Sequence, residues 1–387
     1  MVFDDLSSRL WGLYNESYPG IDINVMQVWE NYTVGSQNVI VSVVDAGIDL
    51  NHEDLAANCA KDGHFNFVDN NAVITPGSHG THVAGTVAAV NNNGMGVCGV
   101  AGGTGNGDGV RLMSCQLFSG STTATVDARA RSYKYAADMG ASILQCSFGV
   151  EAGMYGSDEE YEKIYNVEYD ALQYFIHKPN NEAINGNYVI YASGNDAKPI
   201  SGYPAAHHEY ISVSAIGPDF LPATYTNYGP GCNISAPGGD ISLNQLSTGY
   251  RAQILSTVPD ELAHFDSGYG YMQGTSMACP HVSGVVALGI SYAAKLRKHF
   301  KADELKALLY ETTRPIEQYW NVEAPKQYYK FVTDLGDVHL SNMDLRNYRG
   351  KMGEGQVDAF AFLNAIAGAG VDMTFPNVFV ALDGQTV

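Results

Sequence analysis

A serine among small residues at the start of an apolar helix is the feature of this sequence best suited to chemistry. It is Ser276, within the segment GTSMACPH at 274–281, and an apolar stretch follows at 282–292. The unpaired N–H groups and positive dipole end of a helix N-terminus favour a developing negative charge, so Ser276 is a candidate nucleophile. We expect Pro280 in the first helical turn, where it removes no helical hydrogen bond. By itself, the segment fits a buried small serine in a packing helix equally well.

Two other segments carry an acid and a base. Asp45 directly follows the apolar, β-branched run at 39–44, which is typical of a buried parallel strand, and Gly47 permits an abrupt turn. We therefore expect Asp45 at the carboxyl end of a strand, where open α/β sheets place their sites. A turn or capping aspartate is the alternative. His79 stands at the entrance of a helix of small and apolar residues at 78–89.

His79 and His82 are three positions apart, so they share roughly one helix face and also suggest a metal pair. However, no glutamate lies between or just after them, as zinc-protease helices require. His82 lies inside the small-residue run, which favours a hydrogen-bonded core histidine.

Three segments together resemble the signature blocks of the subtilisin-like serine proteases (subtilases, peptidase family S8). They are VDAGID at 44–49, HGTHVAGT at 79–86 and GTSMACPHV at 274–282, in that family's order of Asp, His and Ser. The likeness extends over about residues 22–370. Three blocks in this order are a highly specific signal.

The resemblance implies a role for each matching residue. Ser276 would be the nucleophile, His79 the base that takes its proton, and Asp45 the acid that fixes the imidazole tautomer. Asn195 follows a further expected strand at 187–192 and matches the family's oxyanion asparagine. Without the resemblance, Gly-Asn at this place would be typical of a turn.

The same resemblance implies a substrate cleft formed by two strand ends that pair with an extended peptide. Gly202 matches a position at the floor of the pocket for the residue before the scissile bond. Because it has no side chain, we predict a deep apolar pocket, although a simple turn glycine is the alternative. The remaining expected substrate-binding residues are Ser147, Phe148, Gly149, Ala192, Ser193 and Gly194.

A calcium site is the cofactor that the resemblance implies, because NNNGMGVCGVA at 91–101 is similar to the family's calcium loop. Calcium prefers six to eight oxygen ligands. The expected ligands are the side chains of Asp54 and Asn93 and the carbonyl groups of Asn91, Met95 and Val97, with Asp22 as a further candidate. Outside the family context, such an asparagine run is typical of a solvated loop.

Composition sets bounds on these interpretations. The chain has 387 residues, of which 45% are hydrophobic and 16% charged, so it can bury one large core or two moderate ones. Its 41 acidic and 21 basic residues leave a net charge of −20, which argues against nucleic acid or an anionic membrane as a partner. The sequence contains no uninterrupted apolar run of about 18 residues, so it predicts no membrane span.

The six cysteines have no Cys-x-x-Cys spacing, so neither a zinc site nor a thioredoxin-type role is expected of them. Most lie in apolar segments, where a thiol packs as a small hydrophobe. Cys279 is the rival nucleophile near the motif, but we expect it to point away from Ser276.

Alternating strands and helices predict a three-layer, doubly wound α/β fold with a mainly parallel sheet, as in subtilisins. We expect an N-terminal extension at 1–21, a peptidase domain at 22–370, and a C-terminal tail or the start of a truncated β domain at 371–387. Three stretches look like insertions, of which the first lies beside the cleft. The expected strands lie near 39–45, 110–117, 142–147, 187–192 and 210–216, the helices near 79–90, 124–139, 159–177, 275–297, 302–312 and 356–367, and the insertions near 150–186, 240–252 and 315–350.

The resemblance implies a serine endopeptidase that hydrolyses peptide bonds through an acyl-enzyme, after large apolar residues. Two alternatives remain: a peptide transamidase or macrocyclase, in which an amine intercepts the acyl-enzyme, and an inactive peptide-binding scaffold. Inactive scaffolds usually lack a triad residue or the oxyanion asparagine, and all four are present here.

The resemblance also implies polypeptide substrates, a monomer, and a secreted or cell-envelope location. Subtilases usually need a removable N-terminal propeptide, and no segment here can be assigned as one. Residues 1–15 lack the basic start and apolar core of a signal peptide, so we expect a mature or trimmed chain.

Overall fold

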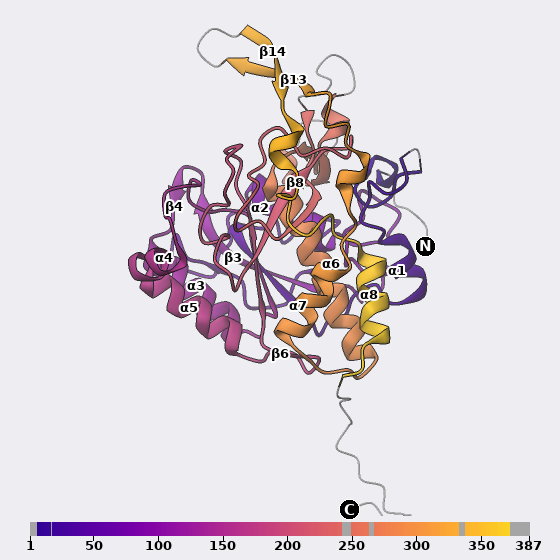
Figure 1. Ribbon diagram of the computed structural model, residues 1–387. Helices are drawn as coiled ribbons and strands as arrows, with labels where there is room; N and C mark the ends of the chain where they lie inside the picture. Colours follow the sequence, from indigo (N-terminus) through magenta and orange to yellow (C-terminus); the bar gives the residue numbers. More distant parts are fainter. Residues whose placement is uncertain (1–5, 17, 242–248, 263–266, 333–336, 372–387) are drawn as a thin grey trace, which may run out of the picture.

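Within the residues that the structure describes, eight strands form one central sheet (Figure 1). This computed structural model describes residues 6–371, apart from residue 17 and residues 242–248, 263–266 and 333–336. The strand order is β2-β3-β1-β5-β7-β8-β9, with β4 paired to β3. Every neighbouring pair is parallel except β3 and β4, so the mainly parallel sheet is confirmed. The sheet strands are β1 (Ile40–Ala46), β2 (Phe65–Asn66), β3 (Arg111–Ser119), β4 (Thr122–Thr123), β5 (Ile143–Cys146), β7 (Tyr188–Ala192), β8 (Ile211–Ile216) and β9 (Ile234–Pro237).

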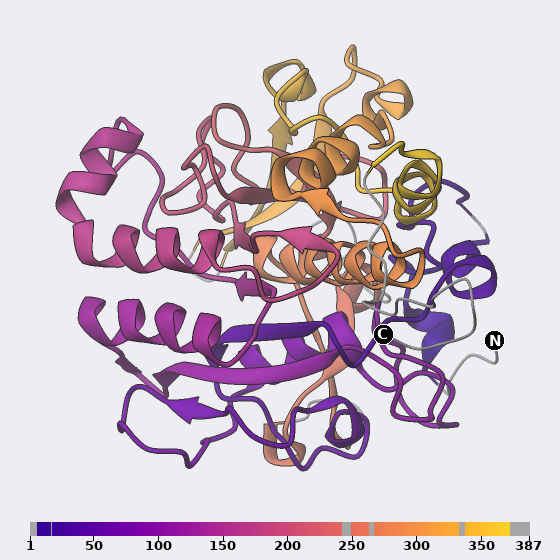
Figure 2. The ribbon, with the colours of Figure 1, turned by 90° about the horizontal axis from the view of Figure 1, so that it is seen from below.

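Helices cover both faces of this sheet. They are α1 (Met26–Asn31), α2 (Ser78–Ala88), α3 (Val126–Asp138), α4 (Asp158–Ile164), α5 (Asn166–His177), α6 (Thr275–Lys295), α7 (Ala302–Glu311) and α8 (Ala359–Gly368). The view from below shows α3 and α5 side by side on one face, with α6 on the other (Figure 2).

Each central strand is apolar on both sides because its residues face two separate cores. Val43 packs into the core that contains residues of α2 and α6, whereas Val44 packs into the core that contains residues of α3 and α5. The successive side chains of a strand point to opposite faces, so a strand covered on both sides becomes a continuous apolar run. This explains why the apolar run at 39–44 indicates a buried strand.

The expected helix at 159–177 is two helices in the structure. Ser157 caps α4 by accepting a hydrogen bond from the Glu160 N–H group, and Tyr165 leaves the helical conformation with φ −108° and ψ 39° before α5 begins. Within this pair, α5 packs against α3 and the sheet, and α4 lies on the outside, as Figure 1 shows.

The longest helix, α6, lies in the core. By length and composition it could span a membrane, but 94% of its most apolar window is buried inside the protein. It packs against α2, α8 and several strands of the sheet. Thus its apolar character follows from its central position.

The N-terminal segment joins the main core. Leu10, Trp11 and Leu13 are buried in the same cluster as α6, and the Trp11 indole N–H donates to the Gln253 carbonyl. The proposed boundary near residue 21 therefore separates no independent packing unit among the described residues. The expected tail lies outside these residues except for position 371.

Three two-stranded sheets lie outside the central sheet in the described part of the chain. The largest falls in the expected insertion at 315–350 and projects from the body as an arm (Figure 1). Its base is held by Lys326, whose buried ammonium group contacts Asp240 at 2.9 Å and Asp219 at 3.3 Å. These sheets are β10 (Ile254–Thr257) with β11 (Tyr269–Met272), β12 (Phe300–Lys301) with β6 (Ile184–Asn185), and β13 (Lys326–Val332) with β14 (Asp337–Met343).

Candidate active site

The expected acid, base and nucleophile come from one strand and two helix starts. Asp45 is the sixth residue of β1, at its carboxyl end, and its side chain is buried. His79 and Ser276 are each the second residue of a helix, α2 and α6. The structure therefore gives each residue the position that the sequence predicts for it.

Asp45 and His79 form a direct contact. The His79 Nδ1 atom lies 2.7 Å from the Asp45 Oδ1 atom. Because a carboxylate can only accept, Nδ1 carries the proton and Nε2 is left with a lone pair, which is the tautomer a general base needs. The Asp45 charge raises the pKa of His79 above its usual value near 6.5, and burial opposes this effect. The Asp45–His79 pair thus favours an imidazole that gains a proton readily.

The Ser276 hydroxyl points to a neighbouring strand end in this structure. Its Oγ atom donates to the Ser147 carbonyl at 3.1 Å, and no hydrogen bond joins it to His79 among the described residues. Catalytic hydrogen bonds are often absent or long in proteins without bound substrate. Rotation about one side-chain bond would be needed to bring the hydroxyl to the base.

Pro280 corrects one expectation about the helix that carries the serine. The helix begins at Thr275, so Pro280 is its sixth residue and lies beyond the first turn. A proline there removes the N–H group that would bond to the Ser276 carbonyl four positions earlier. The Ser147 side chain replaces that group, since its hydroxyl donates to the Ser276 carbonyl at 2.8 Å.

This bond gives Ser147 a role that the sequence analysis missed. The Gln145 amide donates to the Ser147 hydroxyl at 2.7 Å, so a buried chain of hydrogen bonds runs from β5 to the nucleophile's own backbone. The signal in the sequence was Pro280 inside the helix, because it creates one unpaired carbonyl that some polar side chain must satisfy.

Asn195 is oriented by the residue before the nucleophile. Its Oδ1 atom accepts hydrogen bonds from the Thr275 N–H group at 2.9 Å and from the Thr275 hydroxyl at 2.8 Å. A backbone N–H group can only donate, so this network fixes which end of the amide is oxygen. The Nδ2 donor therefore remains available to the cleft.

The two expected oxyanion donors face a common point. A Cβ atom built on Gly274 would lie 3.5 Å from the Ser276 nitrogen and 3.6 Å from the Asn195 Nδ2 atom. Gly274 has φ +148° and ψ 165°, a conformation that residues with a side chain rarely adopt. Glycine therefore keeps the space beside both donors open.

The structure gathers all seven expected substrate-binding residues around one cleft of about 400 Å³ next to Ser276. The cleft lies between the ends of the adjacent parallel strands β5 and β7. Gly202 has a packing reason for lacking a side chain, because a Cβ atom there would lie 2.4 Å from the Val150 carbonyl oxygen. The carboxylates of Glu151 and Asp196 also line the cleft, which is therefore less apolar than expected.

Three nearby polar residues, His82, His281 and Cys279, are buried in the packing around the site. His82 is buried and its Nε2 atom donates to the Ile254 carbonyl at 2.9 Å, which fits the expected hydrogen-bonded core histidine, and burial lowers its pKa to about 3. His281 Nδ1 donates to the Met277 carbonyl at 2.8 Å, and burial lowers the pKa of His281 to about 4. Burial raises the pKa of the Cys279 thiol to about 12, which removes it as a rival nucleophile.

The expected calcium loop folds around a buried carboxylate. Asp54 accepts hydrogen bonds from the Asn93 amide at 2.7 Å and from the Val97 N–H group at 2.9 Å, and the Met95 N–H group donates to Asn93 Oδ1. Asn91 bonds to both backbone groups of Gly99 through its side chain.

This donor set suits a hard cation, because it combines one buried carboxylate, an amide and backbone carbonyl groups. In contrast, Asp22 accepts from the Asn15 and Asn24 N–H groups and experiences the charges of Arg314 and Asp358. The Asp22 carboxylate is therefore engaged by these residues and is not a candidate calcium ligand.

Comparisons with known proteins agree with this geometry. The sequence profile of the Subtilase family matches residues 36–344. Halolysin from Haloferax mediterranei is 31% identical over 297 residues, which cover 74% of this chain and 49% of halolysin. Thermitase from Thermoactinomyces vulgaris is 30% identical over 267 residues, which cover 69% of this chain and 79% of thermitase. The chain therefore belongs to the subtilase family, peptidase family S8, a family of serine endopeptidases.

Solved structures show the same fold. A protease from Pseudoalteromonas arctica matches with a TM-score of 0.65 and 24% identity, covering 94% of this chain and 98% of that one. A serine protease from Aeromonas sobria matches with a TM-score of 0.70 and 20% identity, covering 98% and 69%. The chain spans about half the length of halolysin and 61% of a thermophilic serine proteinase from a Bacillus species.

Proposed function

We propose that this chain is a serine endopeptidase that hydrolyses peptide bonds through an acyl-enzyme on Ser276. The observation that carries the proposal is the 2.7 Å contact between His79 Nδ1 and Asp45 Oδ1, with His79 at the start of α2, which packs against the helix α6 that begins beside Ser276. It leaves His79 Nε2 unprotonated, which is the state required to activate a serine hydroxyl.

In this mechanism the Ser276 hydroxyl turns from the Ser147 carbonyl to His79, which takes its proton as Oγ attacks the scissile carbonyl. The negative oxygen of the tetrahedral intermediate accepts hydrogen bonds from the Ser276 N–H group and from Asn195 Nδ2. His79 then protonates the leaving amine, and Asp45 stabilises the imidazolium. In the second half of the reaction, His79 takes a proton from a water that attacks the acyl carbonyl, and returns it to Ser276 Oγ as the acid product leaves.

Labelling with a fluorophosphonate, read by peptide mass at Ser276, tests this mechanism. The wild type should be labelled, whereas His79→Ala should react slower by several orders of magnitude, because it lacks the base. His299→Ala is the matched control, since His299 contacts the Glu182 carbonyl far along the chain from the triad. Equal labelling of wild type and His79→Ala would contradict the proposal.

For specificity, we propose cleavage after large apolar residues. The walls of the cleft include Gly149 and Ala192, which leave room for a large side chain. The Glu151 carboxylate pairs with Lys198 at 2.6 Å, and the Asp196 carboxylate accepts from the Asn227 amide at 3.0 Å. Both carboxylates therefore already have partners within the protein, so we do not expect either of them to bind a cationic side chain of the substrate. Cleavage of a peptide library mainly after Lys, Arg or Asp would overturn this proposal.

We also propose a structural calcium ion at Asp54, with Asn93 and the carbonyl groups of Asn91, Met95 and Val97. Calcium would replace the N–H groups that now neutralise the carboxylate. An ion present at one hundred times its Kd stabilises the fold by about 2.7 kcal/mol, or about 3 °C in Tm for a chain of this size. Chelation should lower Tm by that amount in the wild type and have little effect in Asp54→Asn. An unchanged wild-type melting curve would remove the site.

The alternative of a transamidase or macrocyclase uses the same acyl-enzyme. Two structural neighbours of this chain are a lanthipeptide protease and a prenylagaramide maturation protease, so peptide maturation is a reasonable context to test. Product mass separates the reactions, because hydrolysis adds one water and cyclisation adds none. The proposed endopeptidase should give only hydrolysed products.

We propose polypeptide substrates and a secreted or cell-envelope location. Two relatives are named as extracellular proteases, from Natrialba magadii and Dichelobacter nodosus. A propeptide or chaperone is the proposed folding partner, since the Aeromonas sobria protease was solved in complex with a chaperone. The monomeric state and the domain boundaries at 21 and 370 remain predictions.

A further inference from the structure

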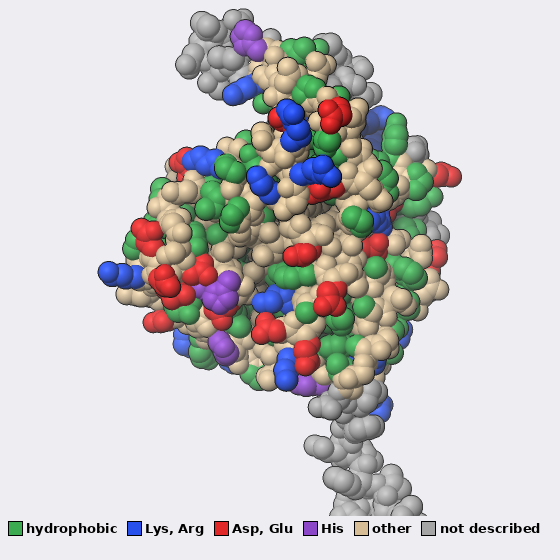
Figure 3. All heavy atoms as spheres, viewed as in Figure 1, with side chains coloured by type: hydrophobic (Ala, Val, Ile, Leu, Met, Phe, Trp, Pro, Cys, Tyr) green, Lys and Arg blue, Asp and Glu red, His purple; other side chains and the backbone are tan. Residues whose placement is uncertain are grey.

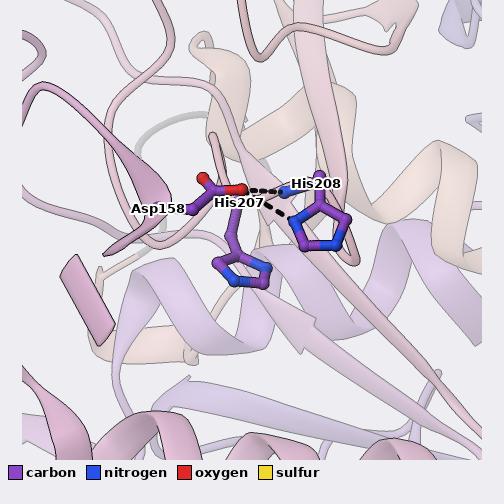
Figure 4. Close-up of side chains that lie close together, drawn as sticks. All are labelled: Asp158, His207 and His208. Carbon is purple, nitrogen blue, oxygen red and sulfur yellow. Dashed lines mark hydrogen bonds and ion pairs between the residues drawn. The ribbon is translucent and has the colours of Figure 1, made fainter. Parts of the chain in front are cut away.

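We propose that Asp158, His207 and His208 form a binding site for a divalent transition-metal ion of the Zn²⁺ type. One potential ligand atom from each residue lies within 4.8 Å of the other two. Figure 4 shows the Asp158 carboxylate directed toward His208, with the His207 ring beside them. The carboxylate comes from the first residue of α4, and both imidazoles come from the loop before β8. Two imidazoles and one carboxylate are a ligand set that Zn²⁺ prefers.

The charge around this cluster favours a cation. Asp158 contacts His208 Nδ1 at 2.7 Å, and Glu162 and Glu209 lie 3.0 and 3.9 Å from the two nitrogens of His207. In the described part of the chain, these three carboxylates form ion pairs with no lysine or arginine. Figure 3 shows histidine and acidic side chains gathered on the surface beside α4 and α5. A divalent ion would offset this negative charge.

His207 is held in a ligand-ready tautomer. Its Nδ1 atom accepts the Glu209 N–H group at 3.3 Å, so Nε2 carries the proton and donates to the Glu162 carboxylate at 3.0 Å. A metal-binding histidine usually donates its other N–H group to a carboxylate in this way. The ring is fully buried and stacks on Tyr210, with centroids 4.6 Å apart, so its orientation is fixed. The long bond from Glu209 is the one that a metal at Nδ1 would replace.

The other two ligands can adjust around this fixed ring. A tetrahedral Zn²⁺ ion with ligands at about 2.05 Å requires ligand atoms about 3.3 Å apart. The Asp158 and His208 atoms, now 2.7 Å apart, would therefore separate slightly to admit the ion. The His208 side chain is 72% exposed, so little opposes this movement. A surface hollow of about 370 Å³ borders His208 and Glu209, so solvent reaches this side of the cluster.

Such an ion would tie the insertion to the wall of the cleft. The Tyr203 hydroxyl donates to Asp158 Oδ1 at 2.8 Å, and the Tyr203 carbonyl accepts the Val150 N–H group at 2.8 Å. Gly202 and Val150 both line the cleft beside Ser276. A metal that joins Asp158 to His207 would therefore fix α4 against the segment that carries Gly202. The site itself requires no catalytic activity.

Calorimetric titration with ZnCl₂ tests the site. All proteins carry Ser276→Ala to prevent self-cleavage, so the result is independent of the proposed peptidase function. The parent should bind one Zn²⁺ ion, and His208→Ala and Asp158→Asn should each weaken binding by at least roughly tenfold, because loss of even an indirect partner costs that much. His339→Ala is the matched control, since it removes an exposed histidine on β14, in the projecting arm, and should leave binding unchanged.

A second measurement reports on position as well as affinity. Zn²⁺ should slow amide hydrogen exchange at 158–164 and 203–208 in the parent but not in His208→Ala. Absence of stoichiometric Zn²⁺ binding by the parent, or equal binding by parent and His208→Ala, would overturn the proposal. Equal binding of Mg²⁺ would overturn the transition-metal preference, because Mg²⁺ prefers oxygen ligands. Matching Tm values of parent and variants in excess chelator establish that each variant is folded.

Discussion

The hydrogen bond between Ser147 and the Ser276 carbonyl can be tested by a double-mutant cycle with Pro280. Ser147→Ala removes the donor to that carbonyl and also leaves the Gln145 amide without its acceptor. Each buried polar group left without a partner costs about 1–3 kcal/mol, so we expect a loss of about 2–6 kcal/mol in the free energy of unfolding.

Pro280→Ala restores an N–H group in helical register with the Ser276 carbonyl. In that background Ser147→Ala leaves only the Gln145 amide unpaired, so the same substitution should cost about 1 kcal/mol less. The coupling energy of the cycle is that difference. It measures how far the serine hydroxyl substitutes for the N–H group that proline lacks.

Urea unfolding in a Ser276→Ala background provides the assay, because the substitution keeps the backbone carbonyl and prevents self-cleavage. Ser291→Ala is the matched control on the same helix, since its hydroxyl donates to the Ala287 carbonyl at 2.7 Å and is remote from Pro280. Control and Pro280→Ala should be additive within about 0.5 kcal/mol. Equally additive behaviour of Ser147→Ala and Pro280→Ala would refute the reasoning.

Three further predictions follow from the site and its supports. Asp45 raises the pKa of His79, and only neutral His79 can act as a base, so kcat/KM should rise with pH through a midpoint above 6.5. Asp45→Asn should move that midpoint to a lower pH and reduce kcat by about 10⁴-fold. Gly274→Ala should lower the rate of fluorophosphonate labelling at temperatures where the variant is still folded, because the added methyl group lies beside both oxyanion donors. An unchanged labelling rate would disprove this. Lys326→Ala should destabilise the protein by about 3–5 kcal/mol because it removes the buried ammonium group that pairs with Asp240 and Asp219, and a urea midpoint equal to wild type would contradict it.

Local sequence patterns predicted five of the eight described strands of the central sheet, and they missed the shorter strands β2, β4 and β9. The apolar run before Asp45 became β1, and the small-residue segments around His79 and Ser276 became the starts of α2 and α6. These predictions succeed because a strand covered on both faces and a helix in the core must be apolar throughout. The boundary between α4 and α5 was missed because Tyr165 has no helix-breaking character of its own.

Predictions that depended on what packs nearby were less complete. Gly202 was interpreted as the floor of an open pocket, yet its immediate neighbour is the Val150 carbonyl, which the insertion brings there. Asp22 was a further candidate calcium ligand, but its carboxylate accepts hydrogen bonds from the Asn15 and Asn24 N–H groups instead. Neither contact is encoded near the residue concerned, so no local pattern could reveal it.

The sequence by itself therefore determined the family and the fold class and supplied the three candidate catalytic residues, since each depends on short motifs with strong local preferences. Only the tertiary structure decided how they are held: the His79 tautomer, the Asn195 orientation and the bond from Ser147 to the Ser276 carbonyl. It also brought Asp158 to His207 and His208, which lie about fifty positions later. Hydrogen bonds and ligand clusters require distances of about 3 Å between atoms, and such distances arise only when separate segments pack together.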